Sequence, residues 1–151
     1  MALSGKKSDK IYDMADLLIN GKDALATYGV RMGDRFLDAL GAPAPMKEYV
    51  TDDSRLEHGR NVITDNARVD SRDLNLEFTI QGASPVDYRA KKKAFFAELY
   101  KGAVNICVPP DSDDTYHLVY KGNSPTYAQS RDRCFGKVIV KFEEPNPTVR
   151  T

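Results

Sequence analysis

Two histidines and two cysteines are the residues of this 151-residue chain best suited to holding a transition metal. They are His58, Cys107, His117 and Cys134. Structural zinc sites draw their ligands from closely spaced pairs, because each pair comes from one turn or one hairpin. These four residues are scattered singly, so the sequence predicts neither a metal site nor a cofactor. Both cysteines have apolar, strand-like neighbours, which favours buried reduced thiols; whether they pair in a disulfide stays open.

Carboxylates gather at "DSDD", residues 111–114, but a calcium-binding loop would also need a central glycine and a terminal glutamate. We therefore predict a solvated turn between two strands. The sequence has no glycine-rich phosphate loop and no Gly-x-Ser-x-Gly nucleophile elbow. On these grounds we expect that the protein is not an enzyme, and we assign no catalytic residue.

The charges of the chain balance, with 22 basic and 22 acidic residues. Proteins that hold nucleic acid by its phosphates usually carry a basic excess, so we expect no specific nucleic-acid binding. The lysines at 91–93 are interpreted as the solvated face of a helix, with a salt-sensitive DNA contact as the weaker alternative. No stretch approaches the roughly 20 apolar residues of a membrane span, and the N-terminus lacks the apolar run of a signal peptide, so no membrane partner is expected.

The stretch "RDLNLEFTIQG", residues 72–82, alternates between apolar and polar residues. Successive side chains of a strand point to opposite faces, so this stretch is predicted to be a strand with one buried face. The polar face carries Asn75, Glu77 and Thr79. It could face water, a substrate, or the inside of an assembly of identical chains.

A helix is predicted at about residues 85–101. Ser84 is a suitable N-cap, Pro85 suits the first helical position, and Asp87 favours the positive N-terminal end. Gly102 is expected to end the helix. An apolar stripe at helical spacing is formed by Tyr88, Phe95, Phe96, Leu99 and Tyr100.

The other predicted elements are mostly strands. Asn20-Gly21 indicates a turn, and Asp23 and Gly29 bound a single helical turn. The stretch "DRFLDALGAPAP", residues 34–45, could form a strand or a short helix, which Gly41 and the prolines would end. Further strands are predicted near 47–50 and 61–64 and at 103–108, 115–122 and 137–144. A long charged loop at 51–67 indicates a partner, because loops of this length in compact domains are usually functional.

One dominant helix and about six strands, mostly consecutive in sequence, favour an α+β fold that is mostly β. We expect an antiparallel β-sandwich or barrel-like sheet packed against the helix. Residues 1–10 are predicted to be a flexible N-terminus, 11–144 a single domain, and 145–151 a tail.

The order of these elements resembles that of phage distal tail proteins over roughly residues 11–144. "LLINGKDALATYGV" resembles the opening of that family, and "EHGRNVITDNARVDSRDLNLEFTIQG" its charged loop and alternating strand. "YRAKKKAFFAELYKG" and "YHLVYKG" follow as the family's helix and a later strand do. The larger family members carry a second, C-terminal domain, for which the residues after 144 are too few. A distal tail, tail-tube or tail-completion role therefore stays open.

The resemblance implies a β-sandwich that assembles with itself into a ring, expected to be a hexamer, which joins the tail tube to the baseplate or tail tip. The other implied partners are the tube, hub and tape-measure proteins of a phage or prophage tail. The protein would then be a virion tail component made in the cytoplasm of the host bacterium. Interface residues are predicted in the loop and on the polar face of the strand: Asp53, Arg55, Glu57, His58, Arg60, Asn75, Glu77 and Thr79.

The alternative function is a small β-rich ligand-binding or enzymatic domain. Its pocket would lie beside the aromatic helix and be lined by Tyr88, Tyr100, Tyr116 and Tyr120. Stoichiometry separates the two hypotheses, since a pocket protein can act as a monomer and a ring component cannot.

Overall fold

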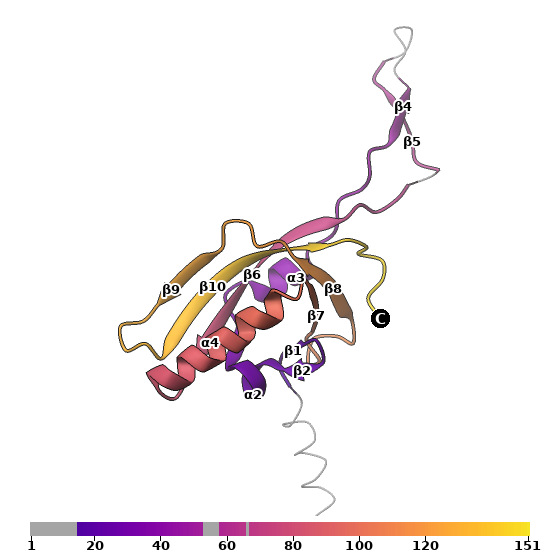
Figure 1. The fold of residues 1–151 in the computed structure, drawn as a ribbon. Coiled ribbons are helices and arrows are strands. Elements are labelled where there is room, and N and C mark those ends of the chain that lie inside the picture. Colours follow the sequence, from indigo (N-terminus) through magenta and orange to yellow (C-terminus); the bar gives the residue numbers. More distant parts are fainter. Residues whose placement is uncertain (1–14, 53–57, 66) are drawn as a thin grey trace, which may run out of the picture.

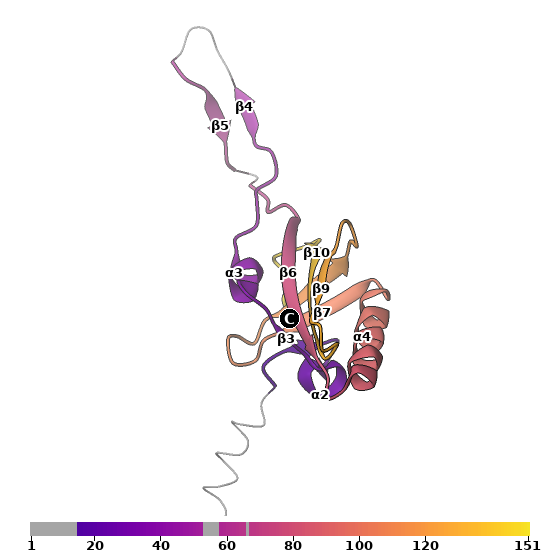
Figure 2. The ribbon, with the colours of Figure 1, turned by 90° about the vertical axis from the view of Figure 1, so that its left-hand side faces the viewer.

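The computed structural model describes residues 15–52, 58–65 and 67–151 (Figure 1). Its main sheet is antiparallel, has the order β2-β1-β7-β8-β10-β6-β3, and curls around the long helix α4 (Figures 1 and 2). Strand β9 pairs with β10 outside this order. The strands of the sheet are β1 (Leu18–Ile19), β2 (Lys22–Asp23), β3 (Val30–Met32), β6 (Arg72–Gln81), β7 (Ala103–Cys107), β8 (Thr115–Tyr120), β9 (Thr126–Gln129) and β10 (Phe135–Glu144). The mostly β, antiparallel, barrel-like α+β fold is confirmed.

Strands β6 and β10 form the centre of the core. They pair along their full length, with Leu76 opposite Val140 and Phe78 opposite Val138. The alternation seen in the sequence is confirmed, because Leu74, Leu76, Phe78 and Ile80 are all buried. Each fully buried side chain of this kind contributes roughly 1.5–3 kcal/mol to folding.

Helix α4 (Pro85–Leu99) covers the concave side of the sheet (Figures 1 and 2). The Ser84 side chain accepts a hydrogen bond from the Asp87 amide at 3.1 Å, which confirms the predicted N-cap. The ring of Phe95 lies 5.1 Å from that of Phe78, so the helix and β6 share one aromatic cluster. The predicted apolar stripe is wrong at its end, because Tyr100 is 71% exposed.

Two short helices complete the body. Asp23 caps α2 (Ala24–Tyr28), and Gly29 ends it with a φ of 65°, as predicted. Residues 34–45, for which the sequence left strand and helix open, contain helix α3 (Phe36–Gly41). Its Phe36 ring packs at 5.2 Å against Phe78, which places α3 against β6.

A second, two-stranded sheet of β4 (Val50–Asp52) and β5 (Asn61–Ile63) stands away from the body (Figure 1). Below it, the two chain segments stay paired: the Lys47 amide donates to the Arg68 carbonyl at 2.9 Å, and Met46 bridges Val69. We call the described residues 46–52, 58–65 and 67–70 the arm. The sequence predicted a loop at 51–67 and a strand near 47–50, whereas the strand lies at 50–52 and continues into the former loop.

A buried ion network holds the root of the arm. The Arg72 guanidinium donates to the carbonyls of Leu40 and Ala42, at 2.6 and 2.7 Å, where α3 ends. Its Nε donates to Glu144 at 2.6 Å, and Glu144 also accepts a hydrogen bond from Arg150 at 3.1 Å. Helix α3, strands β6 and β10 and the C-terminal tail are therefore joined at the point where the arm leaves the body.

Candidate functional site

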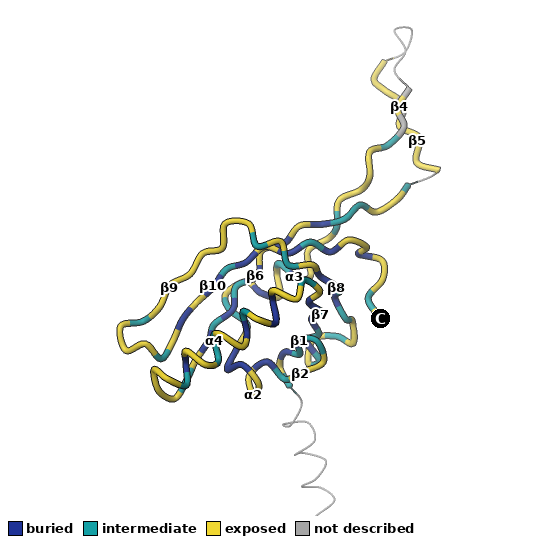
Figure 3. Tube along the Cα trace, in the orientation of Figure 1, coloured by how far each residue is buried: buried dark blue, intermediate teal, exposed yellow. Residues whose placement is uncertain are grey.

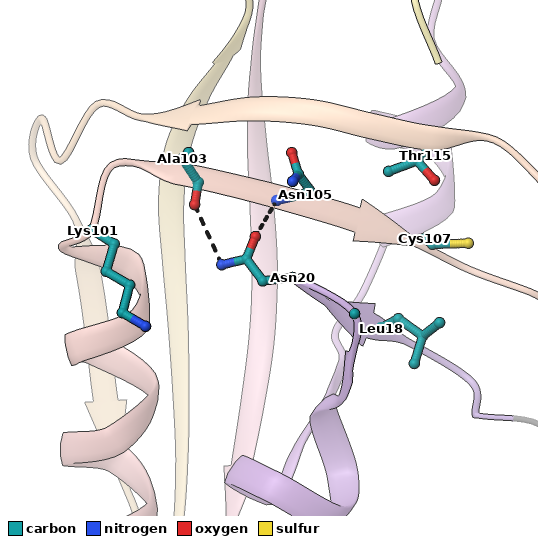
Figure 4. A pocket seen from close by; sticks show the side chains of 8 residues that line it. Leu18, Asn20, Lys101, Ala103, Asn105, Cys107 and Thr115 are labelled. Atoms are coloured by element: carbon teal, nitrogen blue, oxygen red, sulfur yellow. Dashed lines mark hydrogen bonds between the residues drawn. The ribbon is translucent and has the colours of Figure 1, made fainter. Parts of the chain in front are cut away.

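The cavity drawn in Figure 4 lies between the β1–β2 turn and strand β7 and has a volume of about 530 Å³. The Asn20 side chain points from the turn toward β7, where its Oδ1 accepts from the Asn105 amide at 2.8 Å (Figure 4). Its Nδ2 donates to Glu98 of α4 at 2.7 Å. Asn20 thus bonds the turn to both the sheet and the helix.

The ionisable groups near this cavity also have structural roles. Hydrogen bonds from Asn20 and Lys101 hold the pKa of Glu98 below its ordinary value. Burial, and then the charges of Asp113 and Asp114, raise the pKa of the Cys107 thiol, which disfavours the reactive thiolate. Cys107 is therefore not activated as a nucleophile at this cavity.

The histidines and cysteines that the sequence analysis considered as metal ligands have other surroundings. His117 is hydrogen-bonded on both sides, to Asn105 and to the Thr151 carbonyl, each at 3.0 Å. Cys107 and Cys134 are unpaired, half-buried thiols, and Cys134 lies in the turn before β10 where the sequence had indicated a strand. Over residues 15–52, 58–65 and 67–151, no group of three or more His, Cys, Asp or Glu side chains could hold a metal ion. Within the same ranges, no helix is long and apolar enough to cross a membrane.

The arm carries apolar side chains that its own chain does not cover. Val62 and Ile63 of β5 are 44% and 46% exposed, and Met46 and Val69 at the root are also exposed. Figure 3 shows exposed residues along the arm and buried residues in the body. A ribbon of two strands is marginally stable alone, so this arrangement fits contact with another surface.

The predicted interface residues fall in two separate places. His58 and Arg60 are exposed on the arm, and Asp53, Arg55 and Glu57 lie outside the described residues. Asn75, Glu77 and Thr79 lie on the polar face of β6, which is in the body. There the Glu77 carboxylate accepts from the Asp34 amide at 2.6 Å, so part of the polar face supports the segment that leads into α3.

The four tyrosines of the alternative hypothesis do not line one pocket. Tyr88 and Tyr116 are buried in the core. Tyr100 and Tyr120 pack against each other at the surface, with ring centroids 6.0 Å apart. A groove on the outer face of α4 has a volume of about 430 Å³, and Tyr100 alone among the four contributes to its lining.

Strand β9 was missed by the sequence reasoning. Its residues, "TYAQ", are all exposed and pair with β10 on one side. In the part of the chain that the structure describes, β9 has no strand on its other side, so its outer edge offers unpaired backbone groups. Besides Tyr127, β9 has a single apolar residue. It therefore shows no alternation of apolar and polar residues from which the strand could have been predicted.

No protein-family model and no curated protein matches the sequence. Among solved structures, the fold is similar to that of SPP1 Dit (gp 19.1), described as a paradigm of the hub adsorption apparatus in phages that infect Gram-positive bacteria. The two chains share 17% sequence identity with a TM-score of 0.57. The match covers 87% of this chain and 50% of Dit, so this chain spans about half the length of its structural neighbour. The likeness is one of fold.

Proposed function

We propose that this protein is a non-enzymatic structural component of a phage or prophage tail that assembles with itself into a ring. The observation that carries the proposal is the likeness of its fold, over 87% of the chain, to SPP1 Dit, a protein of a phage hub. The ring, which we propose to be a hexamer, joins the tail tube to the baseplate or tip. Its further partners are then the tube, hub and tape-measure proteins of the virion tail.

The arm and the outer edge of β9 support the proposal from the structure itself. Both expose groups that a neighbouring copy can cover: apolar side chains on the arm and backbone donors and acceptors on β9. In a closed ring every subunit provides and receives the same contact, so no edge is left unpaired.

Native mass spectrometry over a concentration series, together with negative-stain images, tests this function. Closed rings with a central channel, six copies in each, are the expected result. A strict monomer at every concentration, with no rings on the grid, would overturn the proposal.

A further inference from the structure

A basic and aromatic groove runs along the outer face of α4. It is lined by Arg89, Lys92, Lys93, Phe96, Ala97 and Tyr100, which recur at helical spacing. From Arg89 to Tyr100 the helix rises about 16 Å, enough to receive roughly five residues of extended chain. We call this surface the α4 groove.

The cations of the α4 groove lack acidic partners. Lys91, Lys101 and Lys121 each form an ion pair with a carboxylate of their own chain. Among the described residues, none of the three cations of the groove lies within 4.0 Å of a carboxylate. Lys92 instead lies over the rings of Tyr127 and Tyr88, at 5.2 and 5.9 Å. Lys92 is therefore held against these two rings at the bottom of the groove. Arg89 and Lys93 are exposed beside it.

The opposite charge lies in the turn between β7 and β8. Asp111, Asp113 and Asp114 are all exposed there, and within the described part of the chain no basic group lies within 4.0 Å of their carboxylates. Arg150 is nevertheless near enough to Asp114 for its pKa, which the hydrogen bond to Glu144 raises most, to be raised by that charge as well. We call residues 111–114 the acidic turn. Strand β7 leads from the end of α4 across the sheet, so the acidic turn and α4 lie on opposite sides of the body (Figure 2).

From this charge complementarity we infer that the acidic turn of one copy docks in the α4 groove of the next. A protruding turn fits a shallow groove, and its carboxylates meet Arg89, Lys92 and Lys93. Because the two surfaces lie on opposite sides of one chain, the contact is head-to-tail, the type that builds rings when the rotation closes. The inference rests on the proposed ring function and names the contact between its subunits.

Charge exchange tests the inference in the full-length chain. The variants are R89E/K93E, D113K/D114K, and all four substitutions in one chain, which restores both complementarity and zero net charge. Either pair should raise the dissociation constant between copies at least about tenfold, because like charges then meet. The fourfold variant, which carries the same four altered positions without a net charge, serves as the control and should return to within about threefold of the unaltered chain. Sedimentation velocity at low salt gives each constant.

The outcomes separate this inference from the proposed function. Rings that form equally well with R89E/K93E would overturn the docking contact and leave the ring function standing. No association of the unaltered chain at any concentration would overturn both. If R89E/K93E instead abolished binding of a fluorescent oligothymidylate at low salt while assembly was unchanged, the groove would belong to nucleic acid and the docking contact would be wrong.

Discussion

The body and the arm of this molecule differ in how far they bury their own apolar side chains. In the body, apolar side chains from six strands and three helices are buried together. Within the described residues, no buried side-chain nitrogen or oxygen lacks a hydrogen-bond partner. The arm exposes Val62 and Ile63 on a two-stranded ribbon. The body therefore buries its apolar side chains within its own fold, whereas the arm leaves Val62 and Ile63 uncovered.

The largest expected effect comes from the buried network at the root of the arm. Arg72→Met leaves the fully buried Glu144 carboxylate without its closest partner, and removing one member of a buried ion pair costs about 3–5 kcal/mol. Urea unfolding should show this loss in the free energy of unfolding. Arg31→Met, at an exposed arginine of β3, is the matched control and should change little. A variant as stable as the parent would mean that the body does not depend on its ion network.

A smaller effect is expected where α4 meets β10. A methyl group at Gly136 would overlap the Tyr88 hydroxyl, so Gly136→Ala should destabilise the body by about 1–3 kcal/mol. The double variant Gly136→Ala/Tyr88→Phe removes the hydroxyl and should recover part of the loss in thermal unfolding. Gly41→Ala, where the added methyl meets open space, is the control. An equal loss in the single and double variants would contradict the predicted overlap.

The Glu98 carboxylate predicts a pH dependence of the body. Its pKa is lowered in the folded chain by hydrogen bonds from Asn20 and Lys101, so its stabilising effect is present above the unfolded pKa. This contribution is lost as the pH falls below the ordinary glutamate pKa of about 4.3 and through the lowered pKa of folded Glu98, and Glu98→Gln should flatten that acidic part of the stability curve. Urea midpoints across this pH range measure it. Asp73→Asn, at an exposed aspartate, should leave the slope unchanged.

The sequence predicted the body better than the arm, for a physical reason. The alternation in 72–81 and the caps of α4 are local signals, and burial against a core reinforced them. The arm has no core to impose a pattern on its residues, so β4 was predicted too early in the chain, near 47–50, although β5 was predicted at its place near 61–64. The proposed docking surfaces were harder still to predict, because the whole fold, and not their spacing in the sequence, brings Arg89 and Asp113 to opposite sides of the body.

The smallest effect on stability is expected in the arm, and it tests the comparison most directly. Val62 and Ile63 are already largely exposed to water. Val62→Asn/Ile63→Asn should therefore change the free energy of unfolding of the body by no more than about 0.5 kcal/mol, as measured by thermal unfolding. Assembly should nevertheless weaken if, under the proposed function, these two apolar side chains contact the neighbouring copy. Val149→Asn, at a tail residue that is 47% exposed, carries the same change of chemistry outside the arm and should leave assembly intact. If the arm variant destabilised the body instead, the arm would be part of the folding unit. If neither stability nor assembly changed, the exposed apolar residues of the arm would not be a contact between copies, and β9 and the α4 groove would be the surfaces to test for the subunit interface.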